Sequence, residues 1–110
     1  MSNMQLFLLQ RLSALVMVPL VFGHLGLMIY AVQGGLSAEE ILGRTQGSLF
    51  WGLYYGFFVL AASLHGAIGL RAILTETINL NAQVLNLMVA VIGITSLALG
   101  LRAVMAVVSS

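Results

Sequence analysis

Three long apolar runs dominate the sequence, spanning approximately residues 6–32, 49–74 and 84–108. Each exceeds the roughly 20 residues that an α-helix needs to cross about 30 Å of hydrocarbon. Only 6% of the 110 residues are charged and 61% are hydrophobic, whereas a soluble domain carries about 25% charged residues. The sequence therefore predicts an all-α membrane protein. We expect one domain over residues 1–110, with three transmembrane helices and the two chain ends on opposite sides.

Charge and cysteine content narrow the classes of function. The net charge of +1 provides no basic face for nucleic acid. The absence of cysteine excludes disulfides, thiolate metal sites and cysteine-ligated iron–sulfur clusters from these 110 residues. Residues 1–10 lack the basic region of a secretory signal, so we expect the first run to remain as a membrane helix. Two arginines fall on each side of the predicted membrane, so charge alone does not orient the chain.

The two connectors carry the polar residues. Residues 33–40 predict a turn followed by a short amphipathic helix, with Ser37 as N-cap and Glu39 and Glu40 in its first turn. Residues 75–81 predict a short polar turn.

Small residues within the runs indicate close helix packing. Gly52 and Gly56 have the Gly-x-x-x-Gly spacing that lets another helix approach, and Gly93 and Gly100 lie one heptad apart in the third run. Because glycine is common in transmembrane helices generally, these pairs predict contacts without requiring them.

His65 lies deep inside the second run, where an imidazole is costly and needs a partner. Ala61 and Gly69 lie one turn away on the same helix face, and small side chains there are expected to leave space for the edge of a macrocycle. With no cysteine present, one histidine per haem predicts a second histidine from a partner subunit. The alternative is a histidine that hydrogen-bonds to a backbone carbonyl or to another helix.

His24, in the first run, is expected at a different depth. It lies 13 residues inside Arg11 and His65 lies six residues inside Arg71, so at about 1.5 Å per residue the two depths differ by about 10 Å. This pair therefore does not readily clamp one haem iron. Either each histidine pairs with another chain, or only one of them is a ligand.

A second polar cluster is expected where the first helix begins and the second ends. Arg11, Ser13, Arg71 and Glu76 are predicted to lie near one membrane interface. A cation, a hydroxyl and a carboxylate at the edge of the hydrocarbon suit a quinone headgroup, whose carbonyls need donors and whose reduction consumes protons. The alternative is that the arginines reach lipid phosphates and Glu76 pairs with one of them.

Two motifs resemble a known family. The run Gln10-Arg11-Leu12-Ser13-Ala14-Leu15, followed by Val18-Pro19-Leu20, is similar to the Q-R-[VL]-[TS]-A opening of succinate dehydrogenase and fumarate reductase membrane anchors. The run from His65 to Arg71 is similar to their H-x-x-x-G-[ILM]-[RQ] pattern, and Leu74-Thr75-Glu76 resembles their L-x-[DE] ending. The chain resembles in particular the smaller, D-type anchor.

The resemblance implies partners and cofactors. A flavoprotein with FAD and an iron–sulfur protein would dock on the cytoplasmic or matrix face, and a second hydrophobic anchor would complete a helical bundle in the lipid. The chemistry on succinate would belong to the flavoprotein. The anchors would hold haem b, with His65 as an axial ligand, and His24 would be the ligand of a second, distal haem if two are present. The N-terminus would face the cytoplasm, most simply at a bacterial inner membrane.

The resemblance also places Arg11, Ser13, Arg71 and Glu76 by the quinone site or the haem propionates. One departure is Thr77, which stands where many family members have a quinone-contacting tyrosine. Two other interpretations remain open from the sequence, a haem-free structural anchor and a small transport or channel subunit.

Overall fold

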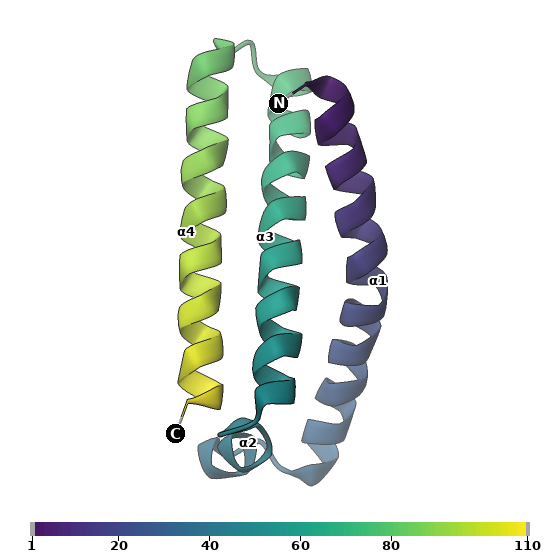
Figure 1. Cartoon of the computed structure of the whole chain (residues 1–110), viewed down its shortest axis with the longest axis vertical. Coiled ribbons are helices and arrows are strands. Elements are labelled where there is room, and N and C mark those ends of the chain that lie inside the picture. The colour runs from purple at the N-terminus through teal and green to yellow at the C-terminus, as the bar shows by residue number, and fades with distance from the viewer. Residues whose placement is uncertain (1, 110) are drawn as a thin grey trace.

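Four helices form the fold of the computed structural model, which describes residues 2–109: α1 (Asn3–Gly34), α2 (Ala38–Thr45), α3 (Leu49–Thr77) and α4 (Ala82–Val108). The long helices α1, α3 and α4 run side by side, and α3 packs against both of the others (Figure 1). The short helix α2 lies at the end of the bundle where α4 finishes, and the two termini lie at opposite ends. The prediction of an all-helical protein with three long helices is confirmed.

Polar caps explain where the helices begin. Ser2 and Ser37 each form a capping box, in which the hydroxyl accepts from the backbone N–H three residues on and the side chain there reaches back to the cap. Ser48 and Asn81 cap α3 and α4. Hydrogen bonds from the Ser37 hydroxyl and backbone N–H hold the pKa of the Glu40 carboxyl below its usual value. The predicted capped helix with Ser37 at its start is confirmed.

The long helices extend beyond the predicted runs, and one prediction was wrong. Thr75, Glu76 and Thr77 belong to α3 and do not form a turn. The hydroxyls of Thr75 and Thr77 donate to the carbonyls of Arg71 and Ile73, four residues back, which lets these polar residues remain helical. The connector to α4 is therefore shorter than predicted.

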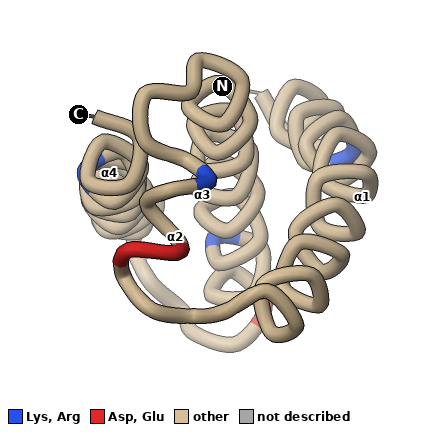
Figure 2. Tube along the Cα trace, turned by 90° about the horizontal axis from the view of Figure 1, so that it is seen from below, with Lys and Arg blue, Asp and Glu red and all other residues tan. Residues whose placement is uncertain are grey.

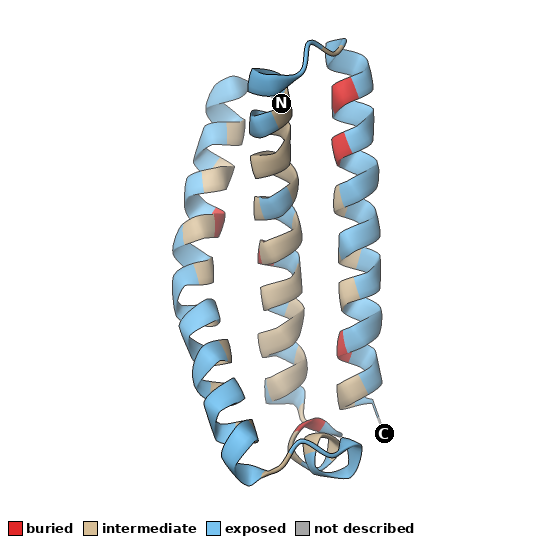
Figure 3. Cartoon of the chain, turned by 180° about the vertical axis from the view of Figure 1, so that it is seen from behind, coloured by how far each residue is buried: buried red, intermediate tan, exposed pale blue. Residues whose placement is uncertain are grey.

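Apolar side chains cover the outside of the bundle. Of residues 2–109, six are buried, on all four helices (Figure 3). Large hydrophobic side chains are exposed along the whole length of α1, α3 and α4, and the molecule is 48 Å long, enough to cross the hydrocarbon and its interfaces. Charged positions are few, with the acidic pair Glu39 and Glu40 on α2 (Figure 2). The chain is an integral membrane protein.

Glycine brings α4 close to α3. A Cβ added at Gly93 would lie 3.1 Å from the Cβ of Ala67, and one added at Gly100 would collide with Val59. Of the other predicted pair, Gly52 faces Val108 of α4, whereas a Cβ at Gly56 would meet nothing within 4 Å among the described residues. The prediction of close packing is therefore confirmed for Gly93 and Gly100, and no close approach is found at Gly56 among the described residues.

One hydrogen bond between α1 and α3 is made by Tyr54. Its hydroxyl donates to the carbonyl of Leu20 at 2.6 Å, and a Cβ added at Gly23 would lie 2.6 Å from the same hydroxyl. Glycine at position 23 therefore makes room for a hydrogen bond that fixes the level of α1 against α3.

The short helix α2 is fastened to the end of α4. The Thr45 hydroxyl lies 3.1 Å from the carbonyl of Ile41 and 2.6 Å from that of Val107, and its single hydrogen is directed to the nearer, Val107. The backbone N–H of Gly47 donates to the carbonyl of Val108 at 2.7 Å. The last carbonyls of a helix have no partner within it. Thr45 and Gly47 therefore cap α4 from the side and close this end of the bundle.

We expect Thr45→Val to lower the unfolding free energy of the purified complex by about 1 kcal/mol, because valine keeps the shape but leaves the Val107 carbonyl without its donor. Chemical unfolding in detergent measures the change. Thr75→Val is the matched control, since the Thr75 hydroxyl is exposed and bonds only within its own helix. Equal effects of the two substitutions would contradict a stabilising hydrogen bond from Thr45 of α2 to the Val107 carbonyl of α4.

Candidate functional site

His65 of α3 is joined to α1 through Ser13. The Nδ1 atom of His65 lies 3.2 Å from the Oγ of Ser13, and that hydroxyl lies 3.0 Å from the carbonyl of Gln10. Ser13 is only 6% exposed and His65 is half-buried. The Nε2 atom of His65 has no hydrogen-bond partner among residues 2–109 and is not among their buried unpartnered atoms, so it is accessible from outside this chain.

Of the two small residues beside His65, Gly69 is covered by α1 and Ala61 lines a cavity of about 180 Å³ between α1 and α3. A Cβ added at Gly69 would lie 3.2 Å from the Nε2 atom of Gln10, and Ala61 is buried. Ala61 and Gly69 lie on the side of α3 that faces α1. Room for a macrocycle on this face therefore stays a prediction: α1 covers Gly69 closely, whereas Ala61 lines the cavity.

His24 of α1 lies among aromatic rings nearer the other end of the bundle. Its ring meets those of Tyr55 and Phe58 edge to face, at centroid distances of 6.3 and 5.4 Å. Its Nδ1 atom is buried without a hydrogen-bond partner. Ser13, at the level of His65, lies eleven residues before His24 on the same helix, which corresponds to roughly 16 Å along the axis. The two histidines therefore occupy different levels of the bundle.

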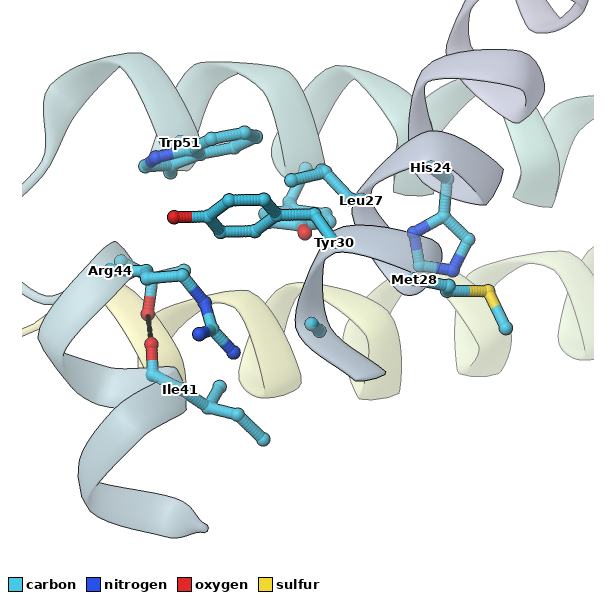
Figure 4. A pocket seen from close by; sticks show the side chains of 10 residues that line it. His24, Leu27, Met28, Tyr30, Ile41, Arg44 and Trp51 are labelled. Carbon is cyan, nitrogen blue, oxygen red and sulfur yellow. Dashed lines mark hydrogen bonds between the residues drawn. The ribbon is translucent and has the colours of Figure 1, made fainter. Parts of the chain in front are cut away.

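Two adjoining cavities, of about 450 and 350 Å³, meet at His24. The larger is lined by Trp51, Tyr30 and Arg44 among others, and Figure 4 shows the Arg44 side chain from α2 beside the Tyr30 ring. The guanidinium carbon lies 5.7 Å from the centre of that ring, and the Nη2 atom donates to the carbonyl of Gly35 at 3.0 Å. The sequence counted Arg44 only as a connector charge, since nothing local shows that α2 folds back beside His24.

The remaining predicted residues lie toward the N-terminal end of α1 but do not form one contact cluster. Arg11 is exposed and its guanidinium carbon lies 5.4 Å from the centre of the Phe7 ring. The Nε of Arg71 donates to the Oδ1 of Asn86 on α4 at 2.9 Å, and Glu76 is exposed on the last turn of α3.

A cavity of about 250 Å³ adjoins Arg71 at this end. Phe7, Gln10 and Ile68 are among its other lining residues, and the Gln10 Oε1 atom is buried without a hydrogen-bond partner. Gln10 is thus a polar residue of this cavity that the sequence placed in a motif without giving it a role.

No group of three or more His, Cys, Asp or Glu residues is close enough to hold a metal ion within residues 2–109.

Long apolar helices, an apolar outer surface and isolated polar side chains inside define a helical membrane protein. The family model described as the succinate dehydrogenase/fumarate reductase transmembrane subunit matches residues 1–104, and the chain belongs to this family. Members are generally cytochrome b subunits, and membership implies a complex with a flavoprotein and an iron–sulfur subunit. No curated protein and no solved structure gives a significant match.

Proposed function

We propose that this chain is a haem-bearing anchor subunit of a succinate:quinone oxidoreductase, which provides a haem b ligand and part of the quinone site. The observation that carries the proposal is the state of His65: its Nδ1 is occupied by Ser13 while its Nε2 is open to the outside of the chain. A haem-ligating histidine commonly has this arrangement, with one nitrogen on a neighbour and the other free for the metal.

The residues around His65 fit a haem that is shared with another chain. Since α1 covers Gly69 and Ser13 occupies Nδ1, the macrocycle is proposed to lie on the side of the accessible Nε2. Haem b supplies a one-electron carrier when it is bound. The role of this chain is to hold one axial nitrogen at a fixed depth and to exclude water with the surrounding apolar side chains. The opposite axial ligand is proposed to come from a second hydrophobic anchor.

His24 is proposed as the ligand of a second haem in complexes that contain two. Support comes from the cavities that meet at its ring and from the Arg44 guanidinium that lines the larger of them, since a cation suits a haem propionate. His24 lacks the neighbour that His65 has, because its Nδ1 is unpartnered. The observations therefore support His65 as a ligand more strongly than His24. Two haems per complex would favour His24 as the second ligand, and one haem would not require it.

The quinone site is proposed at the N-terminal end of α1, beside the cavity that Arg71 lines. Within residues 2–109 only the Nε of Arg71 donates a hydrogen bond, which leaves its Nη groups as donors for a quinone carbonyl. Arg11 and Glu76 lie toward the same end and would complete the site together with the partner subunits. Thr77, on the last turn of α3, is proposed to leave the usual tyrosine contact to another chain.

We expect Arg71→Gln to raise the KM for quinone about tenfold, the equivalent of about 1.4 kcal/mol of lost binding. Succinate oxidation with a soluble artificial acceptor should not change, since it does not require the quinone site. Arg102→Gln is the matched control, because Arg102 is exposed on α4 in the half nearer the opposite end. A normal KM in the Arg71 variant would remove this residue from the quinone site.

The proposal extends to the assembly. We infer a D-type anchor in a bacterial inner membrane, with the N-terminus on the cytoplasmic side where the flavoprotein and iron–sulfur subunits dock. The exposed apolar surface of α1, α3 and α4 is proposed to be shared between lipid and the second anchor.

Affinity purification of this chain from its native membrane tests the proposal. We expect a flavoprotein with FAD, an iron–sulfur protein and a second small hydrophobic chain to co-purify, with succinate:quinone reductase activity. A complex with these partners but without haem would indicate the haem-free structural anchor. Isolation of the chain without redox subunits would favour a transport or channel role.

A further inference from the structure

We propose that Ser13 is the positioning residue of His65: its hydroxyl fixes which imidazole nitrogen faces the haem and how strongly that nitrogen binds iron. This inference rests on the proposed role of His65. It moves Ser13 from the predicted quinone site to the support of the haem ligand.

The direction of the bond between Ser13 and His65 follows from the bond that the Ser13 hydroxyl donates to its own helix. The Ser13 hydroxyl has a single hydrogen, and the Gln10 carbonyl, 3.0 Å away, can only accept it. Toward His65 the Ser13 Oγ must then act as the acceptor, so the hydrogen of the neutral imidazole lies on Nδ1, 3.2 Å away. The lone pair of the ring is consequently on Nε2, the nitrogen that a metal needs.

Burial makes this arrangement selective. Ser13 is the one buried residue of α1 within the described part of the chain, so water does not readily replace its hydroxyl. In the reverse arrangement, with hydrogen on Nε2, the Ser13 hydroxyl would have to turn from Gln10 to His65, and the ring would present a donor to the iron. The Gln10 carbonyl and the Ser13 hydroxyl thus favour the ligating tautomer before haem binds.

Loss of the hydroxyl should weaken haem binding and change its electronic state. Substitution of residues that orient a metal-ligating histidine typically costs 10–100-fold in metal affinity. An Nδ1–H donor bond also makes the other nitrogen more basic, and a more basic ligand favours oxidised iron. In Ser13→Ala we therefore expect about 10–100-fold weaker haem retention and an upward shift of the haem midpoint potential.

The experiment compares Ser13→Ala with Ser13→Thr, which keeps the hydroxyl, and with Ser63→Ala, which removes a hydroxyl from the helix that carries His65. Haem per complex, the midpoint potential by redox titration and the low-temperature EPR spectrum are measured in the purified complex. We expect Ser13→Ala alone to shift the potential and the EPR g values, while Ser13→Thr retains values near those of the native complex. If Ser13→Ala loses haem entirely, retention in Ser13→Thr and Ser63→Ala supports the same conclusion.

Two results would overturn the proposal. One is an unchanged potential and EPR spectrum in Ser13→Ala, or equal loss in the alanine and threonine variants. The other is a higher quinone KM with an unchanged haem, which would return Ser13 to the quinone pocket. His65→Ala separates this outcome from failure of the proposed function: if it retains all haem, the ligand assignment itself is wrong.

Discussion

Replacement of His65 with alanine is expected to remove one haem b from each complex. Alanine has no nitrogen to offer iron, and the Ser13 hydroxyl that holds the imidazole lies on the far side of the ring from the open Nε2. Within the described residues no other histidine lies at this level, because His24 packs against Tyr55 and Phe58. The measurement is the reduced-minus-oxidised optical spectrum per mole of purified complex.

His24→Ala is the matched control for this substitution. In a one-haem complex it should leave the spectrum intact, and in a two-haem complex it should remove only the second haem. Succinate oxidation with an artificial acceptor should persist in both variants, which shows that the catalytic subunits are assembled. An unchanged b-type signal in His65→Ala would eliminate His65 as a ligand.

The second large effect is expected from a single methyl group at Gly100. A Cβ there collides with the Val59 side chain, so either Val59 leaves its rotamer or α4 moves away from α3. In a membrane, close packing of this kind is a main source of helix association, and overpacking a tight contact costs about 1–3 kcal/mol. Gly100→Ala should lower the unfolding free energy of the complex in detergent by about this amount.

Two further variants test whether the collision with Val59 causes the loss of stability in Gly100→Ala. Gly43→Ala adds the same atom to the exposed helix α2, where a Cβ meets nothing within 4 Å, and it should be neutral or stabilising by up to about 1 kcal/mol. The double variant Gly100→Ala/Val59→Ala should recover most of the loss, since it removes the colliding methyl groups. Full stability of Gly100→Ala would contradict a tight contact between Gly100 and Val59.

The architecture could be predicted because its signals are local. Three apolar runs give three long helices, the Ser37 capping box gives α2, and Gly93 and Gly100 mark the contact with α3. The end of α3 was misjudged for an equally local reason. Thr75 and Thr77 bond back to their own helix, so a polar stretch that resembles a turn continues as helix.

The site was predicted less completely because it depends on how the helices are rotated. Ser13 and His65 are 52 residues apart, and no periodicity shows that their side chains meet. The expected grouping of Ser13 with Arg71 used depth alone, whereas Arg71 turns toward Asn86 on α4. Arg44 reaches the His24 cavity only because α2 lies under the bundle.

The most direct test of the account is the haem content of the native complex, purified through this chain and recorded as its reduced-minus-oxidised spectrum. We predict at least one b-type haem for each copy of the chain, in a complex that contains the flavoprotein and iron–sulfur subunits. A complete, active complex without any b-type signal would contradict the central claim.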